Sequence, residues 1–155
     1  MIKKLLFNFL LMTSLFFLDT GSVFPQPKGE SLPEIKLGEI RFQMREVGST
    51  PSQVRMLEIQ IEILNHSPKS TAPPHSIKVL VTPKEIKFPE GASVTELTLN
   101  PEEVSLDLAL PPATGRILII GFVLPERKPE SITFEIQINP PDGEKKTAKW
   151  EGSGN

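Results

Sequence analysis

The chain has 155 residues and a net charge of −2, so it is long enough for one domain with its own core. It contains no cysteine, which excludes disulfides, thiolate catalysis, cysteine-ligated metals and the lipid-bearing cysteine of a bacterial lipoprotein. A chain so close to neutrality lacks the basic surface that nucleic-acid-binding proteins carry, and we expect no nucleic-acid partner.

The N-terminus predicts an export signal. Lys3 and Lys4 form a short positive segment, residues 5–18 form an apolar stretch, and small residues follow at 20–22. The apolar stretch is shorter than the roughly 20 residues that a helix needs to span a bilayer. We expect a signal peptide over 1–22, no transmembrane segment after its cleavage, and a periplasmic or secreted protein. An uncleaved membrane anchor is the alternative.

The rest of the chain divides into three parts. Residues 23–34 are polar and proline-rich, which predicts a flexible spacer. A single β-sandwich domain is expected over 35–150, and the glycine-rich end at 151–155 predicts a disordered tail.

Alternation of apolar and polar residues predicts β-strands through the whole domain. The clearest case is 57–63, where aliphatic residues alternate with Glu and Gln. The 16 prolines and the turn sequences between apolar segments argue against an α/β fold. We expect strands near 36–46, 54–64, 76–82, 94–99, 103–110, 116–124 and 131–138, with short ones at 85–88 and 145–150.

Three finer expectations follow from the same pattern. Residues 104, 106, 108 and 110 are expected to share one face of a strand. Residues 117–124 are apolar on both faces, which predicts a strand in the middle of a sheet or covered on both sides; Gly121 within it predicts a bulge or a close approach of another backbone. The turn at 139–143 predicts a final hairpin, with Trp150 in its second strand covering the sandwich edge.

Seven or more short strands in one domain predict an all-β fold, an immunoglobulin-like two-sheet antiparallel β-sandwich. Residues 58–81, which read EIQIEILNHSPKSTAPPHSIKVLV, resemble the passage between the second and third strands of bacterial immunoglobulin-like domains. The chain is similar in the same way to fibronectin type III modules and to cell-adhesion-related domains of bacterial surface proteins. The resemblance covers the pattern of 35–138 and includes neither the disulfide, the third-strand Trp nor the corner Tyr, so it implies no site residues.

No set of residues predicts catalysis or a cofactor. His66 and His75 are the two histidines of the chain and flank one loop, but no further His or Cys could complete a zinc site with them. Asp107 and Asp142 are the two aspartates after the leader, and neither sits in a pattern typical of a catalytic triad. Phosphate-binding glycine motifs and G-x-S-x-G are absent from the sequence. We therefore expect no enzyme, no cofactor and no metal.

The loops 65–76, 100–102 and 125–130 are expected to cluster at one end of the sandwich, where they form a polar tip that could recognise a partner. Ordinary surface connections are the alternative reading. A second possibility is pairing at a sheet edge, for which the strand at 36–46 is the candidate. The candidate partner-binding residues in the loops are His66, Lys69, His75, Glu126, Arg127 and Lys128.

These observations predict an exported, non-catalytic interaction or structural module of the bacterial envelope that binds an unknown protein. The alternative is a small-ligand or carbohydrate-binding module, which would need exposed aromatic rings. The candidate rings are Phe42, Phe88, Phe122, Phe134 and Trp150.

Overall fold

The computed structural model describes residues 32–49, 53–92, 97–124 and 129–152. The predicted signal peptide, most of the spacer and the last three residues lie outside the described residues. The same holds for the candidate residues Glu126, Arg127 and Lys128 and for part of the strand predicted at 94–99. All described residues belong to one compact unit.

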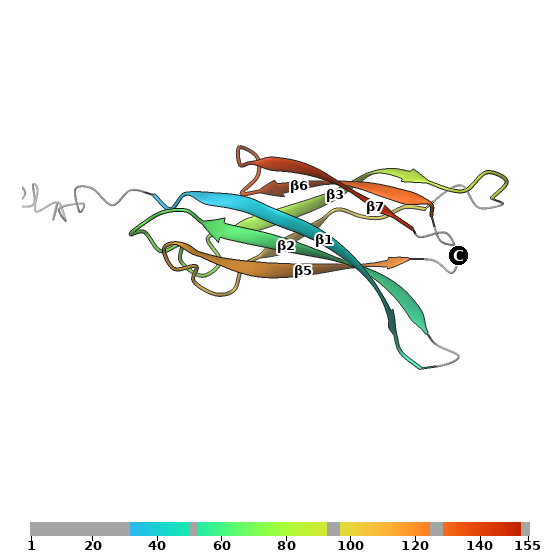
Figure 1. Cartoon of the computed structure of the whole chain (residues 1–155), viewed down its shortest axis with the longest axis horizontal. Coiled ribbons are helices and arrows are strands. Elements are labelled where there is room, and N and C mark those ends of the chain that lie inside the picture. The colour runs from blue at the N-terminus through green and yellow to red at the C-terminus, as the bar shows by residue number, and fades with distance from the viewer. Residues whose placement is uncertain (1–31, 50–52, 93–96, 125–128, 153–155) are drawn as a thin grey trace, which may run out of the picture. The chain divides into compact units, whose positions relative to one another are not determined.

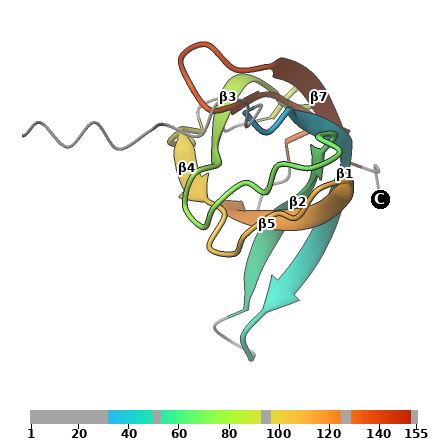
Figure 2. The same ribbon diagram turned by 90° about the vertical axis from the view of Figure 1, so that its left-hand side faces the viewer.

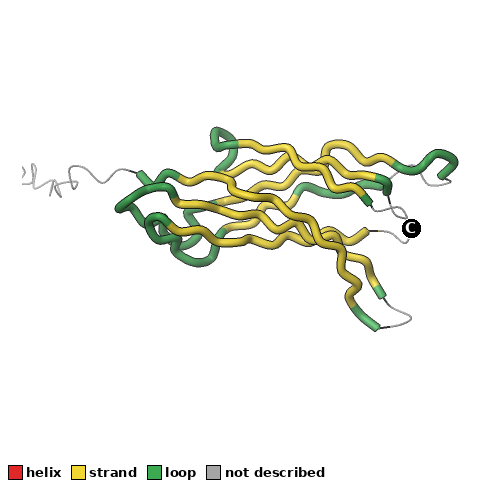
Figure 3. Tube along the Cα trace, in the orientation of Figure 1, coloured by secondary structure: helices red, strands yellow, loops and turns green. Residues whose placement is uncertain are grey.

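All regular secondary structure in the described residues is β-strand (Figure 3). No helix in this part of the chain could cross a membrane. The strands are β1 (Ile35–Val47), β2 (Val54–Asn65), β3 (Lys78–Lys87), β4 (Glu102–Ser105), β5 (Thr114–Leu124), β6 (Ser131–Ile138) and β7 (Lys145–Glu151).

The strands form two antiparallel sheets that lie as two layers (Figure 1). One sheet has three strands in the order β1-β2-β5, and the other has four in the order β4-β3-β6-β7. The predicted all-β fold with two antiparallel sheets is therefore confirmed. The expected strands at 36–46, 54–64, 116–124, 131–138 and 145–150 are confirmed to within two residues of their ends.

Alternation along the strands decides which side chains enter the core. In β2, Leu57, Ile59 and Ile61 are fully buried, while the residues between them point to the outer face of the sheet. Phe134 of β6 joins the two layers, because its ring centroid lies 5.9 Å from that of Phe42 in β1 and 5.3 Å from that of Phe122 in β5.

Two predicted strands have different bounds in the structure. The segments expected at 76–82 and 85–88 form one strand, β3, whose pairing with β6 shifts between Pro83 and Glu85. The strand expected at 103–110 ends at Ser105, and Leu110 forms only an isolated bridge with Ala72. The Leu106 amide still donates to the Ile77 carbonyl past the end of this strand, but Leu108 is 57% exposed and does not share the buried face.

The prediction for 117–124 is wrong, because β5 lies at the edge of its sheet and its outer face is uncovered. Pairing of β5 with β2 runs without a shift from Arg55 opposite Leu124 to Asn65 opposite Thr114, so Gly121 marks no bulge. The neighbour close to Gly121 is a side chain, since an added Cβ would lie 2.7 Å from the Met56 sulfur. An apolar run has the same pattern in a central strand and in an edge strand whose outer face is bare.

The predicted final hairpin is present as β6 and β7, paired from Gln137 opposite Lys145 to Ser131 opposite Glu151. Trp150 is buried in the core from the second strand of this hairpin. The Gly152 amide still donates to the Glu130 carbonyl, so the ordered sheet continues past residue 150.

Candidate functional site

Two open sheets have four edge strands, here β1, β5, β4 and β7. An edge strand carries a row of backbone N–H and C=O groups that another chain can pair with. Proteins block such edges with bulges, charged side chains, short strands or covering groups. An edge that lacks all of these devices is a candidate binding site.

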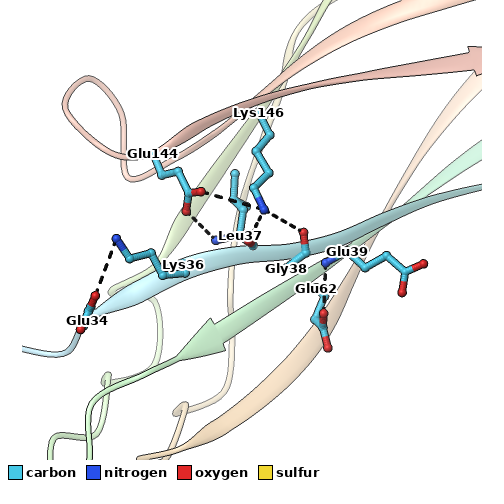
Figure 4. Close-up of polar contacts among 8 residues, drawn as sticks. All are labelled: Glu34, Lys36, Leu37, Gly38, Glu39, Glu62, Glu144 and Lys146. Carbon is cyan, nitrogen blue, oxygen red and sulfur yellow. Dashed lines mark hydrogen bonds and ion pairs between the residues drawn. The ribbon is translucent and has the colours of Figure 1, made fainter.

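The edge of β1 is covered where it meets β7. The Leu37 amide donates to the Glu144 carboxylate at 2.9 Å, and Lys146 Nζ donates to the carbonyls of Leu37 and Gly38 at 2.5 and 3.2 Å (Figure 4). We call these four residues the β1–β7 seam. The register of β1 on β2 also shifts between Leu37 and Ile40. The chain's own side chains therefore occupy the start of the edge at 36–46, and pairing through the rest of this strand stays a prediction.

A glycine lies at the register shift in β1. The Glu62 carboxylate accepts a hydrogen bond from the Glu39 amide at 3.0 Å and lies against Gly38 (Figure 4). Any side chain at position 38 would overlap that carboxylate. A larger residue here would displace the Glu62 carboxylate, which is the acceptor of the Glu39 amide.

Both edges of the four-stranded sheet are protected in other ways. β7 carries Lys145, Lys146 and Lys149 among its seven residues, and charged side chains disfavour pairing with a further strand. β4 has four residues and begins with Glu102 and Glu103, so it offers little backbone to a partner.

Among the described edge strands, β5 alone lacks each of these devices. It has 11 residues, an unshifted register, and neither proline nor charge from Ile117 to Leu124. Figure 2 shows β4 on the side of the sandwich away from β1 and β7, and β5 is the edge of its sheet opposite β1. The outward side chains Ile117, Ile119 and Val123 are 61%, 56% and 56% exposed, and we call them the β5 stripe.

The outer face beside the β5 stripe is polar and held by paired charges. Glu58 of β2 is buried and accepts a hydrogen bond from Arg45 at 2.9 Å. Gln60 of the same strand donates to Gln43 at 3.1 Å. On β1 and β2 these polar side chains are therefore paired across the outer face of the sheet. The apolar part of this face lies along β5.

One ion pair of this face shifts the pKa of a carboxyl group. Arg41 Nη2 donates to Glu39 Oε2 at 2.5 Å, and this hydrogen bond lowers the pKa of Glu39 and raises that of Arg41. The pair lines a small recess of about 60 Å³ that Ile117 borders. Both groups are exposed, and we do not regard the pair as a reactive site. It lies where the polar part of this face meets the β5 stripe.

The three described loop candidates are exposed but have different surroundings. His66 borders a recess of about 370 Å³ beside Ala113, Thr114 and Gly115. His75 lies with its Nδ1 3.4 Å from Asp107 Oδ1, and its backbone φ is 60°. Lys69 is exposed in the same loop.

The predicted clustering of the three loops is not found. Asn65 pairs with Thr114 at one end of β2, whereas Arg55 pairs with Leu124 at the other end. The segment after Leu124 therefore leaves β5 at the end of the sheet opposite His66. Figure 2 looks onto the end that holds the loops after β2 and before β5.

Asn65 organises this loop and was not expected as an important residue. Its amide donates to the carbonyls of Ser70, Leu110 and Pro111 at 2.8, 3.0 and 3.1 Å, and its Oδ1 accepts from the Ser67 amide at 3.0 Å. Asn65 is 1% exposed, so these bonds satisfy its own buried amide and the buried Ser67 amide. Its place at the end of the alternating segment 57–65 was the available signal in the sequence.

Within the described ranges, no three His, Asp or Glu side chains converge on a point that could hold a metal ion. Four of the candidate aromatic rings pack in or against the core, and the fifth, Phe88, borders a recess of about 420 Å³ with Lys84, Ile86, Leu97 and Leu99. Comparison with protein-family models gives no match, and neither does comparison with curated proteins or with solved structures.

Proposed function

We propose that this chain is an exported, non-catalytic interaction module of the bacterial envelope, and that it binds protein by strand addition at the edge of β5. The observation that carries the proposal is the exposed β5 stripe on an edge without a protecting device. In strand addition, backbone hydrogen bonds give affinity and alternate side chains give specificity. Ile117, Ile119 and Val123 are the alternate side chains of this edge.

The strand order supports an immunoglobulin-like sandwich as the scaffold. In constant-type immunoglobulin domains, the first, second and fifth strands share one sheet, and the third, sixth and seventh share the other. This chain has the same partition, with β4 placed beside β3 rather than beside β5. Such scaffolds hold binding elements on a rigid framework.

Export is supported by the positive, apolar and small-residue segments of the first 22 residues. N-terminal sequencing of the protein recovered from cell fractions tests it. We expect a mature chain that starts after Ser22 or nearby, in the periplasm or the medium. A cytoplasmic chain that retains Lys3 and Lys4 would contradict export.

Site-specific photo-crosslinking in the cells that make the protein tests the binding edge. A crosslinking amino acid at position 119 should give a discrete protein adduct, because Ile119 lies at the middle of the β5 stripe. The matched control is position 47, where Val47 of the same sheet is 45% exposed but lies at the far hairpin. Equal adducts at both positions, or none at 119, would contradict the proposal.

The recess beside Phe88 favours a second candidate function, the binding of a small ligand or a carbohydrate. Its walls combine Phe88, Ile86 and Leu97 with the charged Lys84, the mixture that ligand sites use. A ligand-screen hit whose affinity falls in Phe88→Ala, with the fold intact, would support this function. A glycan array that shows no binding would exclude a carbohydrate as the ligand.

A further inference from the structure

We infer that the strand added to β5 is β5 of a second copy of this chain, so that two three-stranded sheets join into one six-stranded sheet about a two-fold axis. This inference rests on the proposed function of the β5 edge and names its partner. The joined order would be β1-β2-β5 followed by β5-β2-β1 of the second copy.

The partner must itself carry an open strand, because an edge pairs only with a backbone whose own N–H and C=O groups are free. In the described part of the chain, β1 is covered at the seam, β4 is short and β7 carries three lysines. β5 is the strand that remains, and each further copy supplies another. Closed two-fold dimers built from one self-complementary patch are the commonest soluble oligomers.

The β5 stripe is complementary to itself in one antiparallel register. A continuous outer face requires outward residues to lie opposite outward residues. Centring the two-fold axis on Ile120 places Ile117 opposite Val123 and Ile119 opposite Gly121 of the second copy. This register pairs all the outward positions from 117 to 123, and registers two residues away leave some of them without an opposite residue in that set.

In this register the Ile119 side chain of the second copy lies opposite Gly121, which has no side chain of its own. The Met56 side chain occupies the space over Gly121, and its sulfur would lie 2.7 Å from an added Cβ. The bulky Ile119 of the second copy can cover that position, and the flexible Met56 side chain can adjust to it. Because residues 117–124 carry no charge, two copies meet here without like-charge repulsion.

The size of the contact predicts reversible pairing. Residues 117–124 span about 26 Å of strand, at roughly 3.3 Å per residue. A contact one strand deep covers less than the about 800 Å² per partner that stable complexes usually bury. We therefore expect a monomer–dimer equilibrium that depends on protein concentration.

Sedimentation velocity of the purified chain over a wide range of concentrations tests the dimer. The unaltered chain should shift from monomer to dimer as concentration rises. Ile119→Lys should weaken the dimer roughly tenfold or more, since it forces a charge into the paired face. Val47→Lys, a matched change on the same sheet away from β5, should leave the dimer unchanged.

The Ile119 side chain is more than half exposed, so its lysine variant should keep the unfolding temperature and circular dichroism spectrum of the unaltered chain. A chain that remains monomeric at every concentration overturns the inference. A dimer that Ile119→Lys and Val47→Lys affect equally also overturns it.

The register is tested by disulfide trapping, because the chain has no cysteine of its own. A mixture of Ile117→Cys and Val123→Cys copies should crosslink on oxidation, since facing side chains of paired strands come within reach of a disulfide. Either variant alone should remain uncrosslinked, because its two cysteines would lie about 20 Å apart along the strands. Crosslinking of one variant with itself would overturn the register.

Photo-crosslinking at position 119 separates this inference from the proposed function. An adduct of twice the chain mass, containing only this chain, supports both. An adduct with another protein supports strand addition at β5 and overturns the second copy as its partner. If no adduct forms, both the proposed function and this inference are contradicted.

Discussion

Asn65 shows how one buried polar side chain can hold a loop. Its four hydrogen bonds connect the end of β2 to the segments that precede β3 and β5. Asn65→Ala should lower the free energy of unfolding by about 2 kcal/mol, because it removes these hydrogen bonds and takes the acceptor from the buried Ser67 amide. Urea unfolding followed by circular dichroism measures the change.

Two variants make this prediction specific. Asn65→Asp keeps the acceptor for the Ser67 amide but loses the donor to three carbonyls, so it should also destabilise the protein. His66→Ala, at the exposed neighbouring position, should change stability by less than about 0.5 kcal/mol. If Asn65→Ala costs no more than His66→Ala, the network does not stabilise the loop.

The pair of Glu39 and Arg41 predicts a measurable titration. The hydrogen bond from Arg41 lowers the pKa of Glu39 below its ordinary value of 4.5, so the folded state favours the carboxylate. The contribution of this pair to stability is present above 4.5 and is lost as the pH falls through the lowered pKa. NMR titration of the Glu39 carboxyl carbon measures the shift. Arg41→Gln should raise the pKa of Glu39, whereas Arg45→Gln, which removes the partner of Glu58, should leave it unchanged.

Single residues were the hardest part to predict from the sequence. An Asn at the end of an apolar segment is typical of a turn. The carbonyls of Leu110 and Pro111 come close to its amide only in the folded chain. The loop histidines stood out by their chemistry, but the structure gives His66 and His75 different neighbours. Contacts between residues far apart in the chain decide such roles, and a local pattern does not contain them.

At the scale of the strands, the β1–β7 seam predicts protection of one backbone amide. Glu144→Ala removes the acceptor of the Leu37 amide and should raise its hydrogen-exchange rate about tenfold, which corresponds to a lost hydrogen bond of about 1.4 kcal/mol. Glu144→Gln keeps an acceptor and should raise the rate less. Glu46→Ala, at the other end of β1, serves as the control. Unchanged exchange at Leu37 in Glu144→Ala would show that the side chain does not protect this edge.

Period-two alternation predicted the strands whose outer faces are polar. The β2 and β6 segments were located closely because Glu, Gln and Thr mark their outward positions. The same reasoning failed for β4, where alternation continues past Ser105 although backbone pairing with β3 stops. It failed for the placement of β5 because hydrophobicity on both faces does not tell which neighbours are present.

At the scale of the whole molecule, Phe134 connects the two sheets. Its fully buried ring contacts Phe42 and Phe122, which belong to different strands of the opposite sheet. Phe134→Ala should lower the free energy of unfolding by about 4 kcal/mol, through lost burial and the cavity that remains. Ile117→Ala, on the exposed β5 stripe, should cost less than about 1 kcal/mol. Equal costs in urea unfolding would contradict the two-layer packing.

The existence of two layers followed from composition and alternation, but the assignment of strands to layers did not. Nothing local in residues 102–105 shows that they pair with β3 instead of β5. The choice depends on where the chain crosses between the sheets after Ser105. Several strand pairings fit the same alternating sequence, and long-range packing selects one of them.

The β1–β7 seam has a consequence for the order in which the protein matures. Leu37 and Glu144 are separated by 107 positions, so nearly the entire polypeptide must be available before these two can meet. During synthesis or passage through a membrane pore, the outer edge of β1 therefore stays uncovered until β7 has been made. A chain cut short before residue 144 would lack β7, so β1 and β6 would be open edges beside β5, and incomplete copies should be more prone to associate than finished ones.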